Sequence, residues 1–183
     1  MDSVKTLNYS AFVKTLEQQM ALYAAYHRDP RNKATHFVGV PLIMAAILIP
    51  LSWVRIEISG FGLTAAMLVA AAVLAYYFVL DLALAAAMLL VLAVLIWLAE
   101  LIAAGGAARG WTWFGILFLG GWTLQLVGHA FEGRRPAFFD NVLQVFVAPI
   151  FLMAEVFFAL GYKPELRKRL SSSGRKASAA PSA

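Results

Sequence analysis

The sequence predicts an all-α integral membrane protein, and two observations carry that prediction. The chain of 183 residues is 62% hydrophobic and only 14% charged, whereas soluble domains are about half apolar and about a quarter charged. The apolar residues are concentrated in blocks close to the ~20 residues that a helix needs to cross the hydrocarbon core. These blocks lack the alternation of barrel strands, which leaves helices as the spanning elements.

The apolar blocks predict a helical bundle with four transmembrane helices. They cover residues 38–54, 61–80, 82–104 and 111–128. Together with the segments around them they are expected to form a single membrane-embedded domain over residues 1–170.

An amphipathic helix is expected before the first span, at residues 10–28. Ser10 is a suitable N-cap, and Asp29-Pro30 ends this helix and starts the next, because proline disfavours a helical conformation in the residue before it. Helical spacing places five residues on one face: Phe12, Leu16, Met20, Tyr23 and His27.

The last apolar block, residues 141–161, differs from the others because it contains Gln144, Pro149 and Glu155. These residues are costly if they face lipid. The block is therefore either a kinked fifth span or a re-entrant pair of half-helices. The positive-inside rule favours the re-entrant element, because it keeps the basic N-terminal arm, the Arg134–Arg135 loop and the basic tail on one side.

The net charge of +5 is concentrated at the C-terminus, where residues 171–183 are expected to be a disordered tail. A basic segment beside a span typically fixes topology or contacts anionic headgroups, so a lipid bilayer is the expected partner and nucleic acid is not. The absence of cysteine excludes disulfides, cysteine-type zinc sites and thiol nucleophiles.

The three histidines of the chain are expected at one membrane face. With four crossings, His36 begins the first span and His129 ends the fourth, so both arrive on the same side. His27 precedes the Pro30 turn and lies on that side as well. Three imidazoles with a nearby carboxylate suit iron(II), zinc or copper.

Polar residues accompany these histidines. Gln125, His129 and Glu132 are spaced by four and three residues, and Asn32 precedes His36 by four, so each set shares a helix face. Such neighbours can hold the second ring nitrogen of a metal-binding histidine.

The histidines, Glu132 and the two arginines that follow it also have simpler interpretations. An interfacial histidine can be a polar side chain at headgroup depth. Glu132 can pair with Arg135, three residues later, and Arg134 and Arg135 can act as topology determinants.

Two stretches resemble the signatures of a known membrane family, the iron-dependent 2-hydroxy-fatty-acid dioxygenases of fungal α-oxidation and their bacterial relatives. The similarity extends over about residues 5–168. The first stretch contributes Tyr26, His27, Asn32, His36, Gly39 and Pro41, and the second Gln125, Gly128, His129, Glu132, Pro136 and Ala137. A third similarity consists of Pro149, Phe151 and Glu155.

The resemblance implies O2-dependent cleavage of a 2-hydroxy fatty acid between C1 and C2, which gives a fatty acid one carbon shorter. It implies Fe2+ as the cofactor, His27, His36 and His129 as its ligands, and Glu132 and Asn32 as further ligands or as groups that hold them.

Four residues are candidates for contact with the substrate: Arg134, Arg135, Gln125 and Tyr26. Arginine suits the substrate carboxylate, because its guanidinium donates two parallel hydrogen bonds. The expected location is the bacterial inner membrane or the eukaryotic endoplasmic reticulum, with the active site on the cytoplasmic face.

Two other functions remain open. One is a different metal-dependent lipid-modifying enzyme, such as a hydroxylase or desaturase, although di-iron membrane enzymes of that kind have many more histidines. The other is a lipid-binding protein without enzymatic activity. The sequence does not indicate an oligomeric state.

Overall fold

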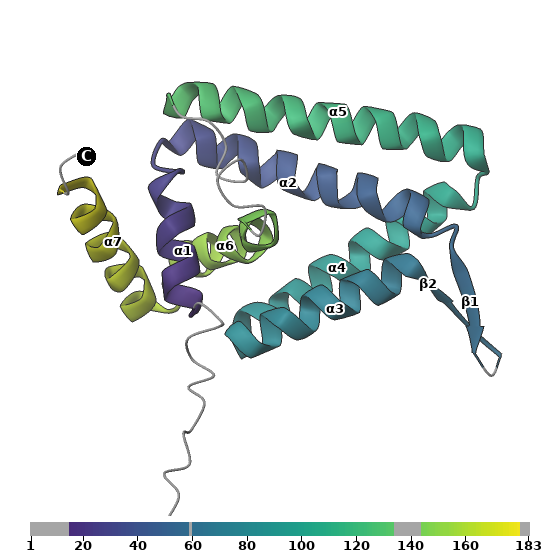
Figure 1. Ribbon diagram of the computed structural model, residues 1–183, viewed down its shortest axis with the longest axis horizontal. Coiled ribbons are helices and arrows are strands. Elements are labelled where there is room, and N and C mark those ends of the chain that lie inside the picture. Colours follow the sequence, from purple (N-terminus) through teal and green to yellow (C-terminus); the bar gives the residue numbers. More distant parts are fainter. Residues whose placement is uncertain (1–14, 59, 134–143, 180–183) are drawn as a thin grey trace, which may run out of the picture.

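The computed structural model describes residues 15–58, 60–133 and 144–179, and the chain is mostly helical, as predicted. The helices and strands, shown in Figure 1, are α1 (Leu16–Ala25), α2 (Pro30–Leu51), β1 (Arg55–Ile58), β2 (Phe61–Thr64), α3 (Ala65–Leu80), α4 (Leu82–Ala103), α5 (Ala107–Glu132), α6 (Gln144–Ala159) and α7 (Pro164–Ala179).

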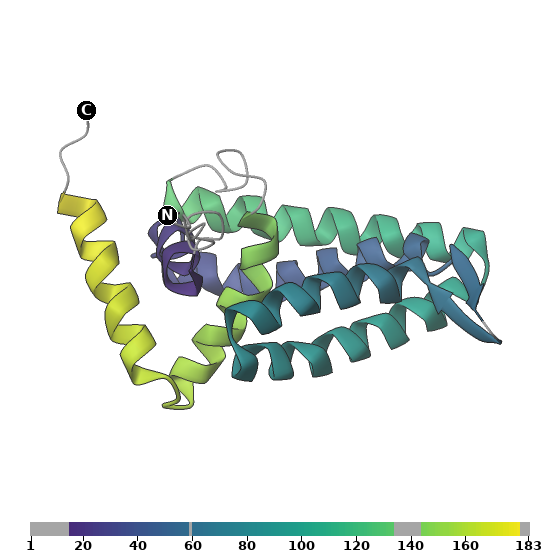
Figure 2. The same cartoon turned by 60° about the horizontal axis from the view of Figure 1, so that its bottom comes forward.

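The long helices form two antiparallel pairs, α2 with α5 and α3 with α4 (Figures 1 and 2). At one end of the molecule α6 contacts both pairs, and α1 and α7 pack side by side next to it. The hairpin of β1 and β2 projects from the opposite end (Figure 1). The start of α2 and the end of α5 therefore lie together at the end that α1 and α6 cover.

Glycines allow α2 and α5 to approach until their backbones touch. A Cβ atom on Gly39 would lie 2.9 Å from the carbonyl oxygen of Gly121, and one on Gly121 would lie 2.6 Å from the side chain of Ile43. Near the hairpin, a Cβ atom on Gly110 would collide with Trp53 at 2.4 Å. Small residues at such contacts are how membrane helices gain close packing.

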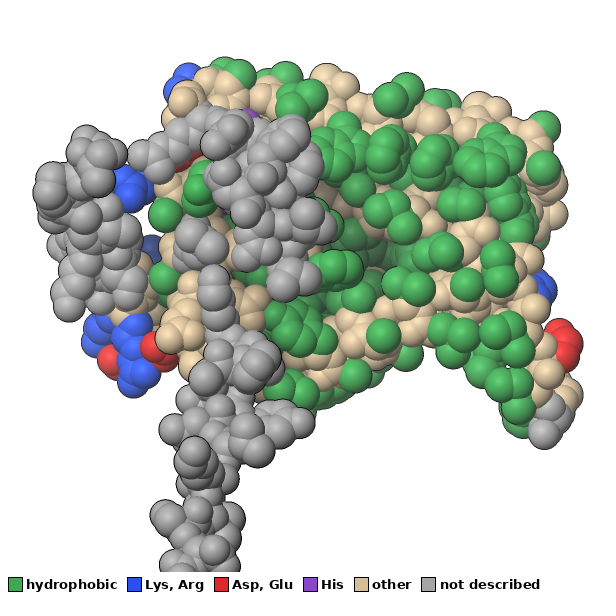
Figure 3. Space-filling model, viewed as in Figure 1, with side chains coloured by type: hydrophobic (Ala, Val, Ile, Leu, Met, Phe, Trp, Pro, Cys, Tyr) green, Lys and Arg blue, Asp and Glu red, His purple; other side chains and the backbone are tan. Residues whose placement is uncertain are grey.

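Among the described residues, three helices are long and apolar enough to cross a membrane, namely α2, α4 and α5. The bent pair of α6 and the first part of α7 passes the same test as a unit, with an angle of 116° between them, so up to four crossings are available. Hydrophobic side chains cover much of the outer surface of the bundle, as expected of a surface in contact with lipid (Figure 3).

The predicted second span is shorter than expected. Block 61–80 becomes strand β2 followed by α3, which has 16 residues and falls below the length of the other candidate spans. Its first four residues pair with β1, so that Phe61 lies opposite Ile58, and Thr64 then caps α3 by accepting a hydrogen bond from the backbone N–H of Met67. The prediction of a helix from residue 61 was wrong, because strand pairing satisfies those backbone groups.

The other predicted spans are displaced at their ends. Block 38–54 corresponds to α2, which begins eight residues earlier, at Pro30, because Asp29 caps it and its side chain accepts from the backbone N–H of Arg31. Block 82–104 corresponds closely to α4, and block 111–128 is extended at both ends in α5.

The N-terminal helix begins later than predicted. Thr15 caps α1 in a reciprocal arrangement with Gln18, whereas Ser10 and Phe12 lie outside the described residues. The other residues of the predicted stripe are buried: Leu16, Met20, Tyr23 and His27.

The C-terminal segment is helical into the region expected to form the tail. Block 141–161 contains α6, and α7 continues as a helix to Ala179 where the sequence favoured disorder from residue 171. Leu166 and Leu170 of α7 pack with Leu16 and Met20 of α1 in one apolar cluster, which gives this polar helix a docking face. Residues 134–143, with Arg134 and Arg135, and residues 180–183 lie outside the described part of the chain.

Candidate metal centre

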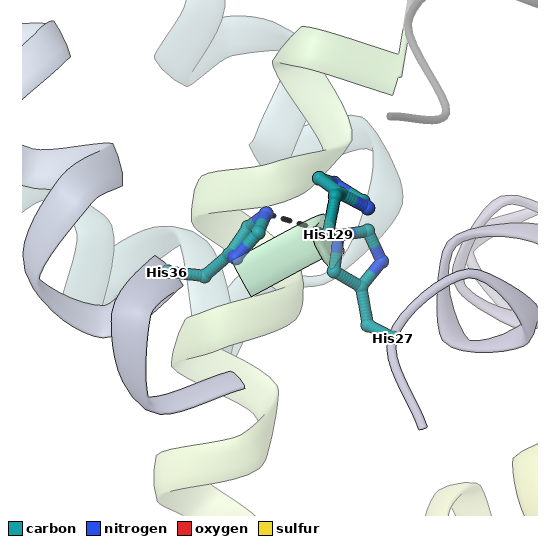
Figure 4. Close-up of side chains that lie close together, drawn as sticks. All are labelled: His27, His36 and His129. Atoms are coloured by element: carbon teal, nitrogen blue, oxygen red, sulfur yellow. Dashed lines mark hydrogen bonds between the residues drawn. The ribbon is translucent and has the colours of Figure 1, made fainter. Parts of the chain in front are cut away.

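The three histidines of the chain meet at the end of the α2–α5 pair (Figure 4). His27 comes from the turn between α1 and α2, His36 from the second turn of α2 and His129 from the last turn of α5. One ring nitrogen of each lies within 4.8 Å of the others, and the side chains are 2–5% exposed. The expectation that these distant residues converge is confirmed; that they bind a metal stays a prediction.

The hydrogen bonds of two of the imidazoles fix which nitrogen is free. The Nδ1 atom of His27 donates to the carbonyl of Tyr23 at 2.8 Å, and that of His36 donates to the carbonyl of Asn32 at 2.9 Å. A neutral imidazole that carries its proton on Nδ1 has only a lone pair on Nε2.

The two Nε2 atoms lie 3.1 Å apart, and this is the contact that Figure 4 marks with a dashed line. With both protons on Nδ1, two lone pairs face each other in a buried place, which is unfavourable unless a cation lies between them. A carbonyl on the far nitrogen of each ring is the usual arrangement for metal-binding histidines.

His129 completes the group of three imidazoles. Its Nδ1 atom is buried and has no hydrogen-bond partner among the described residues. A buried ring nitrogen without a partner calls for a bound ion or water. One nitrogen from each of the three imidazoles gives a set that fits iron(II), zinc or copper, for which imidazole is a suitable ligand.

His27 is held as a neutral base. The ring of Tyr23 stacks on it at 3.9 Å between centroids, and Phe151 lies on the same side at 6.4 Å. Burial, opposed by the hydrogen bond to Tyr23, lowers the pKa of His27 to about 3. The imidazole therefore stays unprotonated, as metal binding requires.

Glu132 fixes the turn that carries His27. Its carboxylate accepts from the backbone N–H groups of Arg28 and Asp29 at 2.8–3.0 Å and from Nδ2 of Asn32 at 3.1 Å. Among the described residues, no carboxylate belongs to the histidine group. These contacts favour a positioning role for Glu132 over direct ligation.

Asn32 is fully buried between the same elements. Its Nδ2 atom also donates to the carbonyl of Tyr26 at 3.3 Å, whereas its Oδ1 atom has no partner in the described part of the chain. That oxygen packs against Gly128, where a Cβ atom would lie 2.5 Å from it. Gly128 thus lets the ends of α2 and α5 close around the histidines.

A cavity of about 80 Å³ adjoins the histidines between α2, α5 and α6. Its wall combines the three imidazoles with apolar and amide side chains: Tyr23, Ile43, Trp122, Gln125, Gln144, Val145 and Ala148. Gln125, a predicted substrate contact, lies in this wall. Tyr26 contributes its backbone carbonyl to Asn32, and Arg134 and Arg135 lie outside the described residues.

Sequence reasoning missed several residues of this wall. Ile43 follows His36 by seven residues and Trp122 precedes His129 by seven, so two helical turns separate each from its histidine. This seven-residue spacing is the sequence signal that points to Ile43 and Trp122. Gln144 stands out in the sequence as a polar residue in an apolar block, but nothing in the sequence links it to the histidines.

A second, more polar cavity of about 470 Å³ is also lined by His27. Lys33 lines it and forms an ion pair with Glu155 of α6 at 2.8 Å. The carboxylate that the sequence placed inside an apolar block therefore has a cationic partner.

Comparisons with known proteins identify the family of this chain. The family model described as "2-hydroxy-palmitic acid dioxygenase Mpo1-like" matches residues 13–160, which include all three histidines. The chain is 36% identical over 157 residues to the 2-hydroxy-palmitic acid dioxygenase MPO1 of Saccharomyces cerevisiae, and the match covers 85% of this chain and 87% of the yeast protein. No solved structure matches it significantly. The chain belongs to the Mpo1-like family.

Proposed function

We propose that this protein is an Fe(II)-dependent dioxygenase that cleaves the C1–C2 bond of 2-hydroxy fatty acids with O2. The product is a fatty acid one carbon shorter. The observation that carries the proposal is the buried group of three imidazoles with two free Nε2 atoms 3.1 Å apart, in a chain similar to a 2-hydroxy-palmitic acid dioxygenase.

His27, His36 and His129 would hold the iron, which would supply O2 activation when bound. Three protein ligands leave coordination positions for O2 and for the 2-hydroxy acid, as in other non-haem iron sites with an incomplete protein ligand set. One O2 balances the reaction when C1 leaves as carbon dioxide and the two remaining hydrogens leave as water.

The residues of the chain orient the ligands and exclude water. The carbonyls of Tyr23 and Asn32 direct the Nε2 atoms of His27 and His36 toward each other. Glu132 holds the turn between α1 and α2 against the end of α5. Such groups behind the ligands typically change metal affinity or activity by about 10–100-fold when they are removed.

The position of the histidines along the bundle suits an amphipathic substrate. They lie at the ends of two candidate spans, α2 and α5. A long acyl chain resides in the hydrocarbon region, while its carboxylate and 2-hydroxyl stay near the headgroups. A centre for C1–C2 cleavage is needed at that depth.

The substrate carboxylate is proposed to pair with Arg134 or Arg135, which follow α5 directly in the sequence. We place the active site on the cytoplasmic face, in the inner membrane of a bacterium or the endoplasmic reticulum of a eukaryote. Arg28, Arg31 and Lys33 at the histidine end support this orientation under the positive-inside rule.

The test is an assay of the purified, Fe(II)-loaded protein with 2-hydroxypalmitate. O2 consumption is followed with an electrode, and pentadecanoate is measured by mass spectrometry. Palmitate, which lacks the 2-hydroxyl, serves as the control and is expected to give neither signal. Absence of pentadecanoate from the iron-loaded protein would contradict the proposal.

A further inference from the structure

The side chain of Gln144 has no role in the site as described so far. It is the first residue of α6 and is 4% exposed. Its Oε1 atom is buried without a hydrogen-bond partner among the described residues. Buried acceptors in proteins are nearly always paired, so this oxygen indicates a donor that the described residues do not supply.

Gln144 lines the same cavity as the three imidazoles. The cavity therefore combines ring nitrogens from α2, α5 and the turn before α2 with amide side chains, Gln125 from α5 and Gln144 from α6. A molecule that contacts both the ring nitrogens and Oε1 of Gln144 must carry a hydrogen-bond donor close to the atoms that approach the histidines.

Apart from Tyr23 and Gln125, the rest of the cavity wall is apolar and extends from the histidine end toward the middle of the bundle. Ile43 and Trp122 lie about 10 Å deeper along the bundle than His36 and His129, since seven helical residues separate each pair. Val145 and Ala148 of α6 continue the apolar wall beside them. Such a lining suits the first methylene groups of an acyl chain.

The size of the cavity limits what it encloses. Its volume of about 80 Å³ is well below the ~300–1,000 Å³ of pockets that bury a drug-sized ligand. It therefore holds the polar end of a long-chain molecule and leaves most of the chain in the surrounding bilayer.

We propose that Gln144 recognises the 2-hydroxyl group of the substrate, with its Oε1 atom accepting the hydroxyl hydrogen. The carbons beyond C2 then follow Val145, Ala148, Ile43 and Trp122 toward the hydrocarbon core. This inference rests on the proposed function and deepens it, because it makes Gln144 the residue that distinguishes a 2-hydroxy fatty acid from an ordinary one.

The test measures binding without turnover. The Fe(II)-loaded, full-length protein is titrated under nitrogen with 2-hydroxypalmitate and, separately, with palmitate, and both dissociation constants are determined for the wild type and for Gln144→Leu. Leucine keeps about the same volume and removes the acceptor. Gln19→Leu is the matched control, because Gln19 is another buried glutamine whose Oε1 accepts from Tyr76 at 2.7 Å, outside the cavity.

The wild type is expected to bind 2-hydroxypalmitate more tightly than palmitate. Gln144→Leu is expected to weaken 2-hydroxypalmitate binding by about tenfold, the usual size for loss of one hydrogen bond, and to leave palmitate binding and iron content unchanged. Gln19→Leu should leave the ratio of the two dissociation constants as in the wild type.

The proposed role of Gln144 would be overturned if Gln144→Leu left the ratio of the two dissociation constants unchanged, including the case in which it weakened the binding of both ligands equally. If the same wild-type preparation still converts 2-hydroxypalmitate to pentadecanoate in air, the proposed function stands and only this inference fails. A wild type that binds neither ligand, or that binds palmitate as tightly as 2-hydroxypalmitate, also overturns the inference. Failure of the assay in air is a separate result that concerns the function.

Discussion

In His27 and His36, the hydrogen bond at Nδ1 decides which ring nitrogen is available to bind a metal. His27 and His36 each donate from Nδ1 to a carbonyl, and this leaves two Nε2 lone pairs 3.1 Å apart. Nothing in the residue types alone gives that tautomer. It follows from helix geometry, which brings the carbonyl of the residue four positions earlier to each ring.

Glu132 is predicted to act through the turn that it holds. Glu132→Ala removes the acceptor for Arg28, Asp29 and Asn32, so the free energy of unfolding should fall by about 1–3 kcal/mol. Iron affinity should fall by about 10–100-fold without being abolished. Chemical denaturation and iron titration measure the two effects.

The control for this change is Glu57→Ala, since Glu57 lies on the exposed hairpin at the opposite end of the molecule. Glu57→Ala should alter neither the free energy of unfolding nor the iron affinity. Complete loss of iron from Glu132→Ala with unchanged stability would show instead that Glu132 is itself a ligand.

The buried neutral state of His27 predicts a pH dependence of stability. The imidazole titrates near 6.5 in an unfolded chain but only at about 3 in the folded one. Between these values the unfolded state binds more protons, so the stability of the metal-free protein should fall as the pH is lowered below about 6.5 and be constant above it.

Thermal unfolding of the chelator-treated protein between pH 5 and 8 checks this, with His27→Phe as the comparison because its ring cannot titrate. The variant should show a shallower decline below pH 6.5. Identical declines in both proteins would contradict a buried, neutral His27.

The contact of α2 with α5 is the element that brings His36 and His129 together. Gly39 and Gly121 let the two backbones touch, and Gly128 gives Asn32 its place beside the histidines. The first signature contains Gly39 and the second contains Gly128, so each glycine accompanies the histidine of its own helix.

Gly121→Ala is predicted to separate these helices. Its Cβ atom would lie 2.6 Å from the side chain of Ile43 and 2.9 Å from the backbone oxygen of Gly39. Overpacking of this kind costs about 1–3 kcal/mol, so the melting temperature and the iron content should both fall.

The adjacent Gly120 is the matched control, because a Cβ atom there meets nothing within 4 Å. Gly120→Ala should leave iron binding unchanged, with stability equal or slightly higher through helix propensity. Equal effects of the two substitutions would contradict close packing at Gly121.

The sequence predicted the helical class, the approximate places of the apolar helices and the common end of the three histidines. It did not predict the hairpin, because Phe61–Thr64 runs without a break into the apolar helix that follows, and pairing with Arg55–Ile58 is what makes it a strand. It also missed Gln144, whose approach to the histidines depends on how α6 docks against α2 and α5.

The whole molecule has two distinct ends. The histidines, α1, α6 and α7 lie at one end, and the hairpin lies at the other (Figures 1 and 2). Basic residues accompany the histidine end in the turn before α2 and in α7. This distribution predicts that the histidine end faces the cytoplasm.

Cysteine labelling tests this orientation, since the chain contains no cysteine of its own. Glu57→Cys in the hairpin should react with a membrane-impermeant maleimide applied to intact cells or, for a eukaryotic protein, to the lumenal side of microsomes. Ser171→Cys in α7 should react only from the cytoplasmic side. The reverse pattern would contradict a cytoplasmic active site.

The central claim, that three buried imidazoles hold a single iron, is tested most directly by elemental analysis of the purified full-length protein and its His27→Ala, His36→Ala and His129→Ala variants. The account predicts one iron per chain in the wild type and almost none in each variant, with the helical circular dichroism retained. Two irons per chain in the wild type, or iron retained by His129→Ala, would contradict it.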